Sequence, residues 1–263
     1  MRRLPLYILL ITTLASCEKV IDVDLKDSEK QYVIEGIITN RADDCSVRVS
    51  RSVSFSSTDG FDGVENANVS IKEEGGNTTT LGAVSKGVYK SGELVVVSGK
   101  SYELQVEIGE RVFKANCTVP ELVPIDSISI REEGFFGEKL KFANVHYKDP
   151  AGKGNAYRFV LYVNGRKEPG IFIRNDDYSD GRPSVITLFT PPDDEKNIKS
   201  GDLVKVEMQS ISSTVYDYWY SLIQGASGNS SSASPANPIS NIEGGALGYF
   251  SAHQIQSVSG MVQ

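Results

Sequence analysis

The strongest hairpin signal in this sequence is Tyr157-Arg158-Phe159-Val160-Leu161-Tyr162-Val163, which runs directly into Asn164-Gly165. Apolar side chains recur at every second position of this run, which is the period of a β-strand. Asn-Gly suits the two central positions of a type I′ turn, because both positions need a positive φ. We therefore predict a strand and a tight hairpin here, with 171–174 as the return arm.

Alternating runs of the same kind recur on both sides of this hairpin, and the clearest one before it covers 102–108. Seven or so short strands at this spacing predict an immunoglobulin-like β-sandwich over 31–120. Pro120 and Pro124 interrupt strand pairing and so mark a domain boundary. We expect a second β-sandwich-like domain over 125–263, and the predicted fold class is all-β.

One segment, near 214–224, changes from the period of a strand to that of an α-helix. Thr214 with Asp217 resembles a capping box, which favours a helix start at this point. An aromatic stripe at helical spacing predicts a short amphipathic helix packed on the second sheet, or else a partner or ligand surface. The positions of this stripe are Tyr216, Trp219, Tyr220 and Ile223.

The first seventeen residues have the form of a lipoprotein signal peptide. Arg2 and Arg3 precede a short apolar run, and Leu14-Ala15-Ser16-Cys17 ends it on small side chains. The run is shorter than the roughly 20 apolar residues that a membrane-spanning helix needs. We predict that Cys17 carries the lipid anchor, with palmitate-like acyl chains holding the protein to the bilayer, and that 18–30 is a tether. The alternative is an ordinary secretory signal in which this cysteine is coincidental.

An envelope location makes the remaining cysteines, Cys45 and Cys117, candidates for a disulfide. The alternative is a pair of buried free thiols. The net charge of −7 and the lack of a basic stripe argue against nucleic acid as a partner, since that affinity comes mostly from cationic contacts to phosphate.

The sequence contains none of the common catalytic motifs: it has no His-Glu-x-x-His, nucleophile elbow, Walker loop or dinucleotide-binding glycine turn. The acidic run 175–181 suggests calcium, but counting from Asp176 puts Thr187 where a bidentate Glu belongs. We therefore predict no catalytic residue, no metal and no cofactor, and expect a protein that is not an enzyme.

A closing motif distinguishes the end of the chain: Asn237-Pro238-Ile239-Ser240-Asn241-Ile242-Glu243-Gly244-Gly245-Ala246-Leu247-Gly248-Tyr249-Phe250. With weaker matches at 17–25, 33–36 and 124–128, it resembles a lipoprotein family of Bacteroidota known as the domain of unknown function numbered four-two-four-nine. The resemblance implies an outer-membrane lipoprotein, often encoded beside a TonB-dependent receptor, with no catalytic residue.

The closing motif also has a physical interpretation. Gly244-Gly245 and Gly248 permit turns and close backbone approach that a Cβ would forbid. We expect the motif to be a structural corner that closes the second domain; alternatively Tyr249 and Phe250 join the aromatic helix in a docking surface.

The function that these observations favour is a non-catalytic accessory to a TonB-dependent uptake or envelope assembly system, acting by protein or nutrient binding at the cell outer membrane. Whether it faces the periplasm or the outside stays open. The alternatives are an envelope hydrolase with paired carboxylates in an interdomain cleft and a freestanding glycan-binding module.

Overall fold

The computed structural model describes residues 30–53, 60–135, 138–191, 197–226 and 237–263. The predicted signal peptide, its Cys17 and nearly all of the tether lie outside these ranges.

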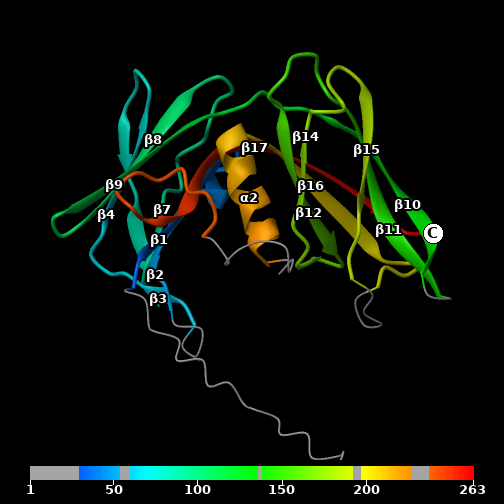
Figure 1. The fold of residues 1–263 in the computed structure, drawn as a ribbon, viewed down its shortest axis with the longest axis horizontal. Helices are drawn as coiled ribbons and strands as arrows, with labels where there is room; N and C mark the ends of the chain where they lie inside the picture. The colour runs from blue at the N-terminus through cyan, green and yellow to red at the C-terminus, as the bar shows by residue number, and fades with distance from the viewer. Residues whose placement is uncertain (1–29, 54–59, 136–137, 192–196, 227–236) are drawn as a thin grey trace, which may run out of the picture.

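Of the described strands, ten join in one mixed sheet that extends through both halves of the molecule (Figure 1). Its spatial order is β13 (Arg166–Lys167), β12 (Ala156–Val163), β16 (Leu203–Ile211), β17 (Leu247–Met261), β1 (Tyr32–Thr39), β2 (Ser46–Arg51), β7 (Val88–Lys90) and β6 (Gly82–Ser85). In addition, β14 (Phe172–Asn175) pairs with β12, and β3 (Asp62–Gly63) pairs with β2. A 3-10 turn at Ala42–Asp44 follows β1, and one α-helix, α2 (Ser213–Ala226), follows β16.

The second half is a two-layered β structure built around the strand predicted at 157–163. A three-stranded sheet, β10 (Ile125–Phe135), β11 (Glu138–Lys148) and β15 (Pro183–Leu188), packs on β12, β16 and the end of β17. Tyr157, Phe159 and Leu161 are fully buried between the layers, as their alternation predicted. The hairpin is also confirmed, since Asn164 and Gly165 have φ of 51° and 80°.

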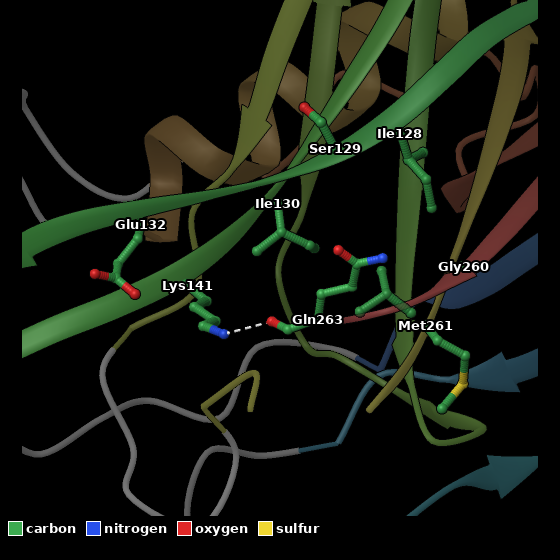
Figure 2. A pocket seen from close by; sticks show the side chains of 9 residues that line it. Ile128, Ser129, Ile130, Glu132, Lys141, Gly260, Met261 and Gln263 are labelled. Carbon is green, nitrogen blue, oxygen red and sulfur yellow. Dashed lines mark hydrogen bonds between the residues drawn. The ribbon is translucent and has the colours of Figure 1, made fainter. Parts of the chain in front are cut away.

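A pocket of about 520 Å³ opens on one side of this half (Figure 2). Its apolar lining includes Ile128 and Ile130 of β10 and Met261 at the end of β17. Lys141 of β11 lies at its side, where the ammonium group donates to the backbone oxygen of Gln263 at 3.0 Å.

The first half is an immunoglobulin-like sandwich, as predicted. A four-stranded sheet, β5 (Thr78–Thr80), β4 (Asn68–Glu73), β8 (Ser101–Ile108) and β9 (Arg111–Thr118), faces β1, β2 and β7 across a shared core. Tyr102, Leu104 and Val106 of β8 are buried in that core because alternate residues of the strand point inward. Two sheets packed face to face across one core are the layered arrangement of this class of sandwich.

The last strand, β17, belongs to both halves, which the division of the chain at 120–125 did not anticipate. Residues 247–253 pair in parallel with β1, and residues 254–261 pair antiparallel with β16. Separating the chain into 31–120 and 125–263 therefore cuts through a continuous sheet. The chain's end completes the first sandwich before it enters the second.

The two cysteines of the described chain are free, so the candidate disulfide is replaced by its alternative, two buried thiols. Cys45 Sγ lies 2.9 Å from the carbonyl oxygen of Leu94, whereas Cys117 Sγ accepts the Ala252 N–H at 3.3 Å. Burial raises the pKa of both thiols above the ordinary value, which keeps them protonated.

No helix in the described part of the chain is long and apolar enough to span a bilayer.

Candidate functional site

Helix α2 lies between the two halves of the molecule and begins at a serine cap (Figure 1). The Ser212 hydroxyl accepts the N–H of Val215 at 3.4 Å, and the Ser212 carbonyl accepts the N–H of Tyr216. Ser212 therefore supplies the cap that the sequence pattern assigned to Thr214 and Asp217.

The buried stripe of α2 is shifted by one residue from the stripe predicted. Val215 and Tyr218 are buried, and Trp219 and Leu222 pack against the core of the first sandwich rather than against the second sheet alone. These residues also stand at i, i+3, i+4 and i+7, because a helix with aromatic residues on two faces offers two overlapping stripes. Only Trp219 belongs to both.

An aromatic cluster fixes α2 to the sheet. The ring centroids of Tyr218 and Trp219 lie 4.6 and 5.2 Å from that of Tyr249. The Arg158 guanidinium lies 4.2 Å from the centroid of Trp219 and donates to Gln209 at 3.0 Å. Contacts on two sides hold Trp219, so the helix has a rigid base.

Arg158 is the residue of this site that the sequence pattern did not single out. It occupies an outward position on the strongest strand, between Tyr157 and Phe159, where a lone arginine usually faces solvent. Here burial lowers its pKa, and the Trp219 ring replaces the carboxylate that would ordinarily pair with it. The feature of the sequence that could have identified Arg158 is the presence of an arginine within a strongly apolar run.

The second stripe of α2 consists of Tyr216, Tyr220 and Ile223, and Tyr216 also packs against the core of the first sandwich. The two tyrosine rings stack, with centroids 6.0 Å apart and planes 17° apart. Tyr220 is 49% exposed, whereas Tyr216 and Ile223 are half-buried. Of the predicted surface residues, Tyr216 and Tyr220 thus stack on each other, and Tyr220 is the exposed member of the pair.

The closing motif is bonded to another side of α2, at Ser221. The Ser221 hydroxyl accepts the backbone N–H of Ile239 at 2.8 Å, and this bond ties the closing motif to the helix. Ile239 itself is 62% exposed. We call Tyr216, Tyr220 and Ile223 the tyrosine face.

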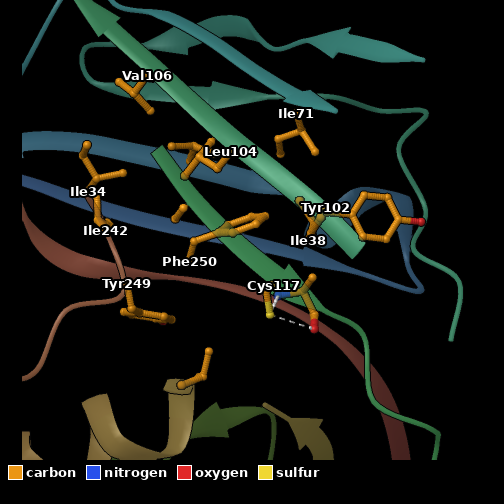
Figure 3. Close-up of a cluster of buried hydrophobic side chains, with 14 of the residues drawn as sticks. Ile34, Ile38, Ile71, Tyr102, Leu104, Val106, Cys117, Ile242, Tyr249 and Phe250 are labelled. Carbon is orange, nitrogen blue, oxygen red and sulfur yellow. Dashed lines mark hydrogen bonds between the residues drawn. The ribbon is translucent and has the colours of Figure 1, made fainter. Parts of the chain in front are cut away.

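Tyr249 and Phe250, also predicted as surface residues, are instead core residues of the first sandwich (Figure 3). Asn241 holds this segment in place by accepting the Phe250 N–H at 2.9 Å and donating to its carbonyl at 2.8 Å. A Cβ on Gly248 would come within 2.0 Å of the Ile34 carbonyl oxygen, so only glycine lets β17 lie beside β1. The motif is a structural corner, as expected, but it closes the first sandwich.

A buried polar group lies on the same side of the ten-stranded sheet as Arg158. Glu207 accepts hydrogen bonds from Arg41 at 3.3 Å, Lys205 at 2.9 Å and Tyr162 at 3.3 Å, so its charge is well compensated. His253 is fully enclosed, and burial with nearby Arg158 lowers its pKa to about 3. The imidazole is therefore neutral at physiological pH.

In the acidic loop that suggested calcium, an aspartate carboxylate accepts hydrogen bonds from the protein itself. The Asp176 carboxylate accepts the N–H groups of Gly154 at 2.7 Å and Asn155 at 2.9 Å. Asp149, which is fully buried, accepts from the Tyr157 and Ser179 hydroxyls. Within the described ranges, no group of three or more His, Cys, Asp or Glu side chains could hold a metal ion.

Comparison with known proteins identifies one family. No curated protein matches the sequence. A crystal structure of the chicken interferon gamma receptor alpha chain matches at 8% identity and a TM-score of 0.22, covering 68% of this chain and 87% of that chain. The model of the family described as "Domain of unknown function (DUF4249)" matches residues 18–259, nearly the whole chain after Cys17. The closing motif and the strand pattern thus lie inside that match, and the chain belongs to this family.

Proposed function

We propose that this protein is a non-catalytic, acyl-anchored lipoprotein of the outer membrane that docks on a TonB-dependent receptor through its tyrosine face. The observation that carries the proposal is the stacked pair Tyr216 and Tyr220, of which Tyr220 is 49% exposed, on a helix whose neighbouring stripe is fixed. The other features below support it.

Tyrosine pairs of this kind suit a protein partner. Tyrosine offers a large contact area, loses little side-chain entropy on binding and keeps a hydroxyl for a polar contact. Binding hot spots are rich in tyrosine and arise where the surrounding surface is well packed. The base formed by Tyr218, Trp219 and Tyr249 satisfies that condition.

A binding role also fits the state of the buried carboxylates. Asp149 and Asp176 accept hydrogen bonds from the structure around them, Glu168 pairs with Arg166 at 3.1 Å, and Glu207 binds two cations. A glycosidase would need one carboxyl free to donate a proton and another free to attack or activate water. These four acids already serve the fold.

The anchor is tested through Cys17 alone. We expect wild-type protein to incorporate labelled palmitate and to fractionate with outer membranes, and Cys17→Ser to lose both properties. If Cys17→Ser still carries label and stays with the membrane, the signal is not a lipoprotein signal.

The partner is tested by isolating the anchored protein from native membranes in mild detergent and measuring stoichiometry by mass spectrometry. We expect a β-barrel receptor near one to one with wild type, and loss of at least tenfold for the double variant Tyr216→Ala, Tyr220→Ala. The matched control is Phe61→Ala, which removes an aromatic ring of similar exposure, 44%, from the first sandwich. Equal recovery of the receptor by all three proteins, or recovery of the protein alone, would refute the docking role.

A further inference from the structure

The open side of the second half is bounded by two strand edges that no described strand covers. β10 ends its sheet, and the last part of β17 extends beyond its partner β1. The pocket of about 520 Å³ lies between them, a size within the range of ligand sites (Figure 2).

The direction of the peptide groups on β10 follows from the pairing of β11. Asp149 donates its N–H to the Arg182 carbonyl, so odd-numbered residues of β11 bond to β15 and even-numbered ones bond to β10. The register of β10 with β11 then directs the peptide groups of Ser129 and Arg131 to β11. Those of Ile128, Ile130 and Glu132 point to the free edge.

The same reasoning applies to β17. Asn40 exchanges two hydrogen bonds with the N–H and carbonyl of Ile255, at 2.8 and 3.2 Å, and so acts as the last rung on the β1 side. Residues 259 and 261 have the same parity as Ile255, so their peptide groups also point to the β1 side, where β1 has already ended. Ser259 and Met261 are also exposed.

The pocket between these edges is lined by apolar residues together with Ser129, Glu132, Lys141 and Gln263. Ile128 and Ile130 are half-buried and face Val204 and Gly260 across the pocket, while Met261 is 65% exposed at its rim. Gly260 has no side chain, and a Cβ there would be in van der Waals contact with Ile128, 3.8 Å away. The slot thus combines unpaired backbone groups with alternating apolar contacts.

We propose that this slot binds an extended segment of a partner polypeptide, which adds to the β10 edge as a further strand and places alternate apolar side chains in the pocket. Unpaired N–H and C=O groups at strand spacing select a polypeptide backbone in β conformation, which lipids and glycans do not offer. Two-residue periodicity then sends every second side chain of the segment towards Ile128 and Ile130. This site is separate from the tyrosine face and does not depend on it.

The probe is a set of acetylated decapeptides with Val, Ile or Leu at alternate positions and Thr or Lys between them. The full acylated protein in mild detergent selects the tightest binder, which is then labelled for fluorescence anisotropy. Hydrogen exchange should show new protection at the amides of Ile128, Ile130 and Glu132. Methylating the backbone nitrogens that face β10 should weaken binding tenfold or more with the side chains unchanged.

Two matched variants isolate the backbone contact. Glu132→Pro removes one free-edge N–H without breaking the β10–β11 ladder, because proline is tolerated at that side of an edge strand. Glu132→Thr removes the carboxylate and its 2.9 Å contact to Lys139 but keeps the N–H. We expect the proline variant to bind at least tenfold more weakly and the threonine variant to bind as wild type does.

A third variant, Gly260→Val, fills the slot from β17 and should also abolish peptide binding. Urea unfolding serves as the folding control, and each variant should unfold at the same urea midpoint as wild type. Equal binding by Glu132→Pro and Glu132→Thr, or equal binding by methylated and unmethylated peptide, overturns the proposal. So does the absence of any binder in the set. A peptide copying 18–29, whose Ile21, Val23 and Leu25 alternate with polar residues, is tested alongside; tighter binding by it than by any decapeptide would make the occupant the chain itself and refute a partner.

Discussion

At Gly248 the backbone of β17 passes so close to β1 that the two strands can pair only if this residue has no side chain. Its φ is 98°, and an added Cβ would lie 2.0 Å from the Ile34 carbonyl oxygen. Gly245 has a similar φ of 80° but open space around it. The two glycines therefore separate backbone strain from steric conflict.

We predict that Gly248→Ala lowers the free energy of unfolding by about 4 kcal/mol, because it combines strain with a clash that moves β1. Gly245→Ala should cost only about 1 kcal/mol, since strain acts alone. Urea unfolding of both variants measures the difference. Similar losses for the two would show that β17 does not approach β1 as described.

A second residue, His253, makes stability depend on pH. Its pKa falls from 6.5 to about 3 on folding, so the unfolded chain binds a proton that the folded chain excludes. The resulting stabilisation is complete above pH 6.5 and is lost as pH falls from there towards 3.

From pH 7 to pH 5 we expect wild type to lose about 2 kcal/mol through this histidine. His253→Phe should not show this loss. The difference in free energy of unfolding between wild type and variant should therefore become smaller as pH falls. Chemical unfolding at the two pH values tests this. A difference in stability that does not change with pH would mean that His253 has the same pKa in the folded and unfolded chains.

At the scale of elements, α2 shows which of its two aromatic stripes belongs to the core. Tyr218 is 9% exposed and contacts Tyr249, whereas Tyr220 is 49% exposed. Tyr218→Ala should lower the free energy of unfolding by about 3 kcal/mol, as loss of a buried aromatic ring does. Tyr220→Ala should cost about 1 kcal/mol or less. The reverse order would restore the stripe expected from sequence.

How far sequence could lead differs between elements. The strand at 157–163 and its Asn164-Gly165 turn were predictable because a two-residue period and two positive φ angles are local properties. The helix was predictable as a helix, but its buried side was not, since Tyr216 and Tyr218 are equally aromatic. Only the position of Tyr249, far along the chain, selects Tyr218.

The partners of β17 were beyond local reasoning for the same cause. No local pattern within 247–261 indicates that the first part of β17 pairs in parallel with β1 and the last part pairs with β16. Gly248 indicated that the backbone approaches another strand closely, but it did not indicate which strand. The predicted disulfide was wrong for the same reason, because the number of cysteines does not give the distance between Cys45 and Cys117.

Across the whole molecule, the shared strand β17 and the helix between the halves predict cooperative unfolding. The single tryptophan, Trp219, lies at the junction and reports on α2 directly. We expect Trp219 fluorescence and far-ultraviolet circular dichroism to change in one coincident urea transition. Two separated transitions would show that the halves fold as independent domains.

The docking of the tyrosine face is tested most directly by placing the photoreactive residue p-benzoylphenylalanine at position 220 of the anchored protein in native membranes. Irradiation should give a cross-link to an outer-membrane β-barrel receptor at position 220 and none when the same residue replaces Phe61. Cross-links to the receptor from position 61 alone, or no cross-link from position 220 while the receptor still copurifies, would contradict the proposed docking face.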